Sequence, residues 1–166
     1  MYVYHLKDKM ELEPELLIHA SRTGNLQVLS ELIKGDTDLN VKDEKGYTPL
    51  IIACYNKQFE AAKLLIEYGA DVNAVDNGGN TALMGVAFKG YPEIAELLIE
   101  NGADLNKQHG NGGTALMFAV MFGRNDLVKL LLLHGAKTDI CDARGLTVFE
   151  IAAQQGNTEA IDMLGG

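Results

Sequence analysis

The chain repeats itself with a period of about 33 residues, and this period constrains its fold more than any other feature. A Gly and, two positions later, a Thr recur at that spacing: Gly46 and Thr48, Gly79 and Thr81, Gly112 and Thr114, Gly145 and Thr147. Self-similarity at a period of roughly 20–50 residues is typical of solenoids, in which one supersecondary unit is stacked on the next. The sequence therefore predicts a stack of similar units.

Each unit is expected to hold two helices. Thr is a good N-cap, and Pro49 after Thr48 occupies the first helical position, where its missing N–H costs nothing. Thr147 and Glu150 fit the reciprocal capping box, and Pro92 is placed to open a second helix. Glycines are expected to end the first helix at Gly90, Gly123 and Gly156 and the Leu-rich second helix at Gly69, Gly102 and Gly135. Linking segments such as ADVNAVDNGGN have the composition of a tight turn or short hairpin.

The composition indicates a globular protein and argues against some classes of partner. With 166 residues and 47% hydrophobic content, the chain is compatible with one domain of ordinary size. A net charge of -9 would repel a phosphate backbone, so nucleic acid is not an expected partner. The sequence has neither the pattern of a secretory signal nor the roughly 18 uninterrupted apolar residues of a spanning helix. We therefore expect a soluble, cytoplasmic monomer that does not interact with membranes.

Residues that could carry chemistry are scattered. Cys54 and Cys141 fit no metal-ligand spacing and no CxxC pair, so two free thiols are expected. The four histidines lack a Cys or His at ligand spacing: His5, His19, His109 and His134. Asp71 and Asp104 lie in GAD turns, where Asp ordinarily bonds its own backbone. No catalytic motif is recognisable, and we expect neither an enzyme nor a metal or cofactor site.

The units resemble ankyrin repeats. They match the pattern D-x-x-G-x-T-P-L-x-x-A-A followed by L-L-x-x-G-A-D-x-N over roughly residues 14–164. An earlier, degenerate unit appears one period back, where Ala20, Gly24 and Asn40 align with Ala53, Lys57 and Asn73. The resemblance implies an all-α solenoid of about five repeats, each with two antiparallel helices and a β-hairpin or turn. The expected organisation is an N-terminal extension, 1–13, and an ankyrin-repeat domain, 14–166, divided near 14–42, 43–75, 76–108, 109–141 and 142–166.

The resemblance also implies a binding surface. In ankyrin stacks the seventh and eighth positions after the capping Thr line a concave groove, together with the hairpin tips. The candidate partner-binding residues are Tyr55, Asn56, Phe88, Lys89, Met121, Phe122, Tyr47 and Asn80. Weaker candidates at the hairpin tips are Glu44, Lys45, Asn77, Asn111, Arg144 and Leu146. An exposed apolar stripe usually marks a partner site, but the alternative is that these side chains pack between repeats as additional core.

The implied function is non-enzymatic binding of another protein. Within the family, TALMGVAFKG and NGGTALMFAVMFGR are similar to small bacterial ankyrin proteins associated with catalase and peroxide defence, which implies an accessory role in oxidative-stress defence. One alternative is an inhibitor or immunity protein that blocks an enzyme's active site, for which an acidic groove would be useful. Another is a structural spacer, which a fully polar groove would favour.

Overall fold

The computed structural model describes residues 2–35 and 37–165, with side chains from Leu12 onward in those ranges. This part of the chain contains helices and no strand. The helices are α1 (Tyr2–Thr23), α2 (Leu26–Ile33), α3 (Pro49–Tyr55), α4 (Phe59–Glu67), α5 (Ala82–Lys89), α6 (Pro92–Glu100), α7 (Ala115–Met121), α8 (Asn125–Leu133), α9 (Val148–Gln155) and α10 (Thr158–Gly165). The predicted boundary between extension and first repeat falls inside α1, which runs through Pro14 without a break.

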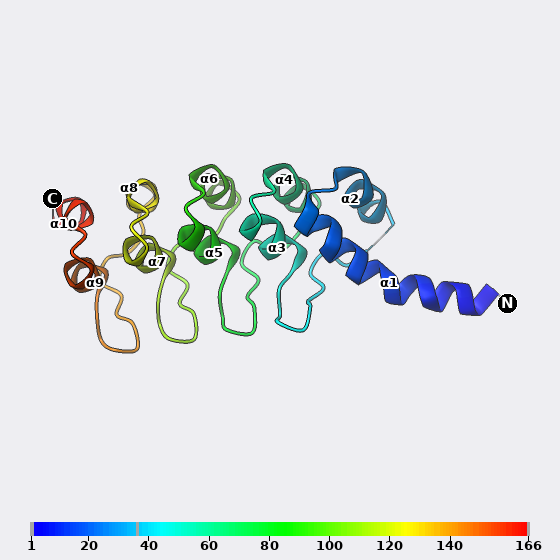
Figure 1. Cartoon of the computed structure of the whole chain (residues 1–166), viewed down its shortest axis with the longest axis horizontal. Helices are drawn as coiled ribbons and strands as arrows, with labels where there is room; N and C mark the ends of the chain where they lie inside the picture. Colours follow the sequence, from blue (N-terminus) through cyan, green and yellow to red (C-terminus); the bar gives the residue numbers. More distant parts are fainter. Residues whose placement is uncertain (1, 36, 166) are drawn as a thin grey trace.

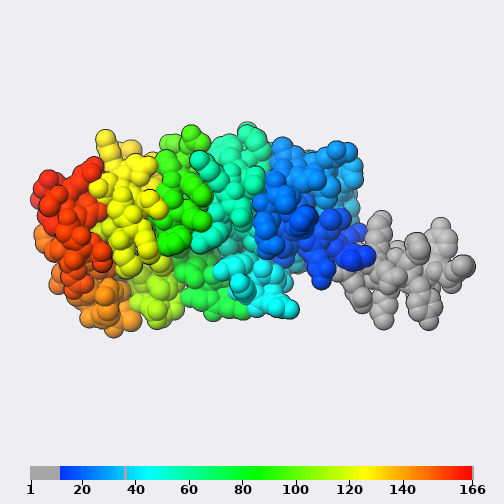
Figure 2. Space-filling view, in the orientation of Figure 1, coloured from blue at the N-terminus to red at the C-terminus, as the bar shows by residue number. Residues whose placement is uncertain are grey.

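The helices form two layers (Figure 1). Consecutive helices pair, from α1 with α2 to α9 with α10, and each pair packs on the next. Helices α1, α3, α5, α7 and α9 form the inner layer, and α2, α4, α6, α8 and α10 form the outer layer. In Figure 2 the pairs follow one another along the long axis in the order of the sequence. The stack predicted from the repeat period is therefore observed as an all-helical solenoid.

The predicted helix starts and ends are confirmed. The capping Thr of each inner helix from α3 to α9 accepts a hydrogen bond from the backbone N–H three residues later, as Thr114 does from Met117. The Glu150 carboxylate accepts from the Thr147 N–H at 2.7 Å and completes the capping box. Gly90 and Gly156 end α5 and α9 in the left-handed conformation, with φ of 84° and 64°. These contacts satisfy backbone groups that every helix end leaves open.

Lys57 departs from this glycine rule. It occupies the position that Gly24, Gly90, Gly123 and Gly156 occupy in the other units. Its φ is 60°, and within the described residues it is the one non-glycine residue with positive φ. The left-handed conformation costs a residue that has a Cβ roughly 1–2 kcal/mol.

Buried leucines at the repeat period form the core. The inner layer contributes Leu17, Leu50, Leu83 and Leu116, and the outer layer contributes Leu65, Leu98 and Leu131. Burial of apolar surface is worth about 25 cal/mol per Å², so these ladders supply much of the stability. The cysteines are both free, as predicted, with Cys54 buried and Cys141 exposed. Burial raises the pKa of Cys54 to about 12, which keeps it a neutral thiol.

The linking segments are loops that bond to one another from unit to unit. Asn77 N–H donates to Lys45 O at 3.1 Å, and Ala143 N–H donates to Asn111 O at 2.9 Å. The Asp71 and Asp104 carboxylates accept from the backbone two residues on, both at 2.9 Å, as predicted for the GAD turns. The described loops close by turns and contain no strand, so the hairpin part of the prediction is not confirmed. None of the described helices is long and apolar enough to cross a membrane.

We expect Thr81→Ala and Thr114→Ala each to lower the free energy of unfolding by about 0.5–2 kcal/mol. Both side chains are buried, so truncation leaves the N–H of Met84 or Met117 without its acceptor. Urea denaturation of the two variants measures the loss. Thr138→Ala, at an exposed loop position, is the matched control and should change stability by less than about 0.5 kcal/mol. Midpoints as high as the control's for both cap variants would contradict the assignment.

Candidate functional site

A row of aromatic side chains follows the ends of the inner helices. The rings of Tyr55 and Phe88 are parallel, with centroids 6.2 Å apart, and Phe122 meets Phe88 edge-on at 4.6 Å. Phe118 is nearly parallel to Phe122 at 6.4 Å. Offset-parallel and edge-on pairs at these separations are favourable geometries for aromatic rings. Because Tyr55, Phe88 and Phe122 come from α3, α5 and the end of α7, the row spans three consecutive units.

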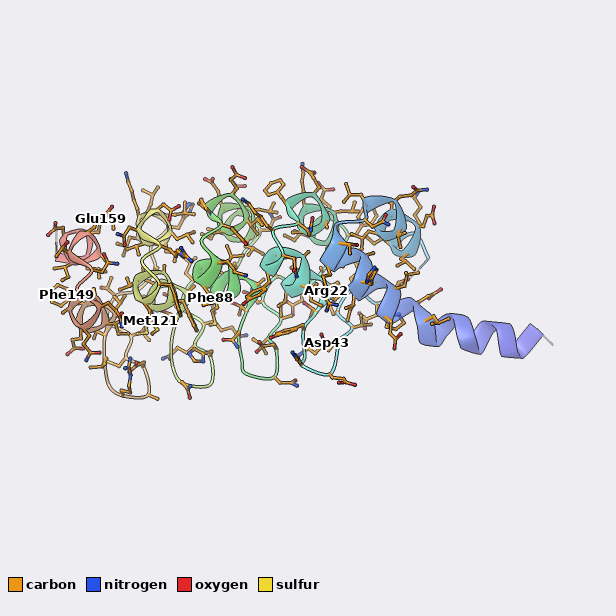
Figure 3. The ribbon with its side chains drawn as sticks, in the orientation of Figure 1. Arg22, Asp43, Phe88, Met121, Phe149 and Glu159 are labelled. Atoms are coloured by element: carbon orange, nitrogen blue, oxygen red, sulfur yellow. The ribbon has the colours of Figure 1, made fainter. Side chains whose placement is uncertain are left out.

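The row is partly open to solvent. Tyr55 and Phe122 are each 42% exposed, whereas Phe88 and Met121 are half-buried and Met121 packs against the core. The alternative that these side chains form additional core therefore applies in part to Phe88 and Met121, which are half-buried. It does not apply to Tyr55 or Phe122. Figure 3 shows Arg22, Phe88 and Met121 following one another along the stack, with Glu159 in the outer layer.

Two cavities open beside this row, where the inner helices meet the loops. The first has a volume of about 410 Å³, with Tyr47 and Asn80 on the loop side and Arg22, Tyr55 and Phe88 at the helix ends. The second has a volume of about 470 Å³, and its lining includes Asn111, Met117, Met121, Arg144 and Ile151. Phe118 lines both and separates them. We call this surface, from Tyr47 and Tyr55 through Phe88 and Phe118 to Met121, the groove.

Gly85 lines the first cavity. It lies inside α5 at the position that His19, Ile52, Phe118 and Ile151 occupy in the other units. A Cβ at Gly85 would lie 3.2 Å from Cδ2 of Tyr55, so the Tyr55 ring packs into the space that a side chain would take. Glycine in a helix interior costs roughly 1 kcal/mol relative to alanine. Gly85 therefore lowers the stability of α5 at a position that lines the cavity.

The structure brings the predicted site residues together on one surface. Tyr47, Tyr55, Asn56, Asn80 and Phe88 line the first cavity. Met121 lines the second cavity, Phe122 contacts Phe88, and the Lys89 ammonium lies 4.6 Å from the centroid of the Tyr55 ring. Their role in binding stays a prediction.

The loop candidates divide into two groups. Asn111 and Arg144 line the second cavity, while Glu44, Lys45 and Asn77 join neighbouring loops through hydrogen bonds and Leu146 packs against the core. Sequence reasoning did not select Gly85, Phe118 or Arg22 as site residues. A signal for Gly85 exists, because it is a lone glycine within a helical pattern where the adjacent units have large side chains.

The two carboxylates that line the cavities, Asp76 and Asp142, are already engaged. Asp76 accepts from the N–H groups of Gly78 and Asn80, both at 2.8 Å. Asp142 pairs with Arg144 at 2.8 Å. Partial burial works against ionisation of Asp142, but hydrogen bonds from Leu146 and Arg144 outweigh it and hold the pKa of this carboxyl below its usual value. These acids stabilise their own turns and offer a ligand little free acceptor capacity.

The described groove is lined mainly by apolar and aromatic side chains. Among the described residues no three His, Cys, Asp or Glu side chains gather where they could hold a metal ion, and no buried side-chain nitrogen or oxygen lacks a hydrogen-bond partner. Cavities of roughly 300–1,000 Å³ with apolar walls and a few polar groups are typical of binding sites. The lining of the first cavity, aromatic rings with Asn56 and Asn80, fits that description.

Comparison with known families agrees with this architecture. A family described as ankyrin repeats (3 copies) matches residues 16–109 and again residues 83–165. The two matches together run from the second half of α1 to the end of α10. A search of curated proteins gave no match.

Proposed function

The chain belongs to the ankyrin-repeat family, and from this we propose that it binds another protein through the groove. Ankyrin repeats are generally protein–protein interaction modules and are typically non-catalytic. The observation that carries the proposal is the row of Tyr55, Phe88 and Phe122, which is partly exposed and lies beside two cavities. Aromatic residues and Met are enriched in the centres of protein interfaces, where a few of them dominate the binding energy.

Two narrower roles follow from the same premise. The segments that contain α5 and α7 resemble ankyrin proteins associated with catalase and peroxide defence, so an accessory role in oxidative-stress defence is one. The other is an inhibitor or immunity protein, which would present acidic groups to a basic active site. The described groove supports this second role less, because Arg22 and Lys89 lie beside the first cavity and Asp76 is held by its own loop.

A site-specific photo-cross-linker tests the proposal. We expect a photoreactive phenylalanine analogue in place of Phe122 to form a covalent adduct with a partner protein in native cells. The same analogue at Tyr68, which is exposed at the end of α4 in the outer layer, is the control and should not form that adduct. Mass spectrometry of the adduct names the partner and distinguishes a peroxide-defence protein from an inhibited enzyme. An adduct that forms equally at both positions would contradict binding through the groove.

A further inference from the structure

The segments at the ends of the inner helices carry net positive charge in an otherwise acidic chain. The net charge is -9, yet the four segments where α1, α3, α5 and α7 end each carry one cation: Arg22, Lys57, Lys89 and Arg124. These segments, 22–24, 55–58, 88–91 and 121–125, and the corresponding 154–157 contain no Asp or Glu. Apart from those in α1 and Glu150 in α9, the acidic residues are in the outer helices and the loops. Net positive charge therefore lies at these helix ends, while the loop side of the groove contributes Asp76 to the first cavity and Asp142 to the second.

The helix dipole does not explain this placement of the cations. Cations are stabilised near the C-terminal end of any helix by roughly 0.3–1 kcal/mol, so the outer helices should carry them as well. Instead α4 ends at Glu67 and α6 ends at Glu100, although Lys34 follows the end of α2. Arg124 lies three residues beyond the end of α7 and is the N-cap residue of α8, where the helix dipole disfavours a cation. Lys57 is also held at φ 60° where the other units have glycine, at a cost in backbone energy. Helix stability alone would favour neither the acidic ends of α4 and α6 nor a lysine at position 57.

The cations at the groove edge are not neutralised by the protein. Within the described side chains the ion pair present is Arg144 with Asp142, in the loop of the last unit. The Lys89 ammonium lies over Tyr55, and Arg124 Nε donates to the carbonyl of Phe88 at 3.2 Å. Arg22 is exposed and lines the first cavity. The edge thus has free positive charge directly beside aromatic surface.

Resting on the proposed function, we propose that the groove binds an acidic segment of a partner protein that carries a large apolar side chain. The apolar side chain occupies the first cavity, against the rings of Tyr55, Phe88 and Phe118 that line it. Carboxylates that flank it in the segment face Arg22 and Lys89. Burial of the apolar group supplies affinity, and the complementary charge supplies orientation and rate of association. A nucleic acid fits less well, because the acidic loops and outer helices would repel its backbone.

Selection from a peptide library tests two features of the proposed segment together, its negative charge and its large apolar side chain. The probe is a displayed library of random peptides of about 12 residues, which span about 40 Å when extended. The full chain is the bait. We expect the enriched peptides to share a net negative charge and one large apolar residue. Binding of an enriched peptide should weaken as NaCl rises from about 0.05 M to about 0.5 M, because salt screens exposed charges.

Three variants assign the contacts. Lys89→Glu should weaken binding of the enriched peptide at least about tenfold. Lys129→Glu reverses an exposed charge on the outer helix α8 and should leave binding within about twofold. Gly85→Leu places a side chain against the Tyr55 ring and into the first cavity, and it should abolish binding. Circular dichroism checks that this variant is folded. Because the charge variants lie on the surface, failure to fold does not obscure the comparison.

The outcomes separate this proposal from the proposed function. Enriched peptides without a charge bias that still fail to bind Gly85→Leu would overturn the acidic segment and leave groove binding standing. Enrichment of nothing, or of peptides that bind all three variants equally, would overturn both. A single-stranded oligonucleotide that binds as tightly as the best peptide and is lost in Lys89→Glu would replace the acidic protein segment with nucleic acid.

Discussion

Leu116→Ala should lower the free energy of unfolding by about 2–5 kcal/mol. Leu116 is the second residue of α7, is fully buried and belongs to the leucine ladder of the inner layer. Truncation removes apolar contacts and leaves a cavity that the neighbouring helices α5 and α9 close only in part. Urea denaturation followed by circular dichroism measures the change. Domains of this size are stable by only about 5–15 kcal/mol, so this is a large fraction of the total.

Leu133→Ala is the matched control for this substitution. Leu133 ends the neighbouring helix α8 and is 80% exposed. The same atoms are removed, but they make few contacts, so the free energy of unfolding should change by less than about 0.5 kcal/mol. Equal losses at the two positions would mean that the periodic leucine ladder is not the core.

The helices could be predicted from the sequence because their signals are local. Each signal acts within one turn of the helix. The capping Thr accepts a hydrogen bond from the N–H three residues later, Pro occupies the first helical position, and Gly ends the helix. The same signals recur in successive units, since Thr48, Thr81 and Thr114 all cap their helices in the same way. The start of α1 could not be predicted from such signals, because the degenerate first unit lacks the capping Thr and the helix runs from Tyr2 through Pro14.

The groove could be predicted only by position. Periodicity places Tyr55, Phe88 and Met121 on equivalent helix positions, but it does not say how far each side chain is covered by its neighbour. That depends on contacts between units, such as the Phe122 ring on Phe88 and the Tyr55 ring against Gly85. At Gly85 the absence of a side chain admits the Tyr55 ring, and both residues line the first cavity. A pattern of residue types does not contain that geometry.

We expect Phe122→Asp and Tyr55→Asp to weaken partner binding by about 2 kcal/mol or more each, which is about 30-fold in the dissociation constant. Each substitution removes an exposed aromatic side chain that would contact the partner. It also introduces a charge that loses its water when the partner binds, which costs free energy. The measurement is the affinity for the partner identified by cross-linking, or for a peptide enriched by display. Folding should suffer far less, because both side chains are substantially open to solvent before the substitution.

Tyr68→Asp is the control that separates binding from folding. Tyr68 caps α4 as Phe122 caps α7, so an Asp at either position meets the same unfavourable helix dipole, worth roughly 0.3–1 kcal/mol. Tyr68 is 57% exposed and belongs to the outer layer, away from the groove. The stability changes of Phe122→Asp and Tyr68→Asp should therefore be similar, and only Phe122→Asp should lose the partner. If Phe122→Asp instead unfolds far more easily than Tyr68→Asp, or if it binds the partner normally, the aromatic row serves the packing between units and the groove is not the binding surface.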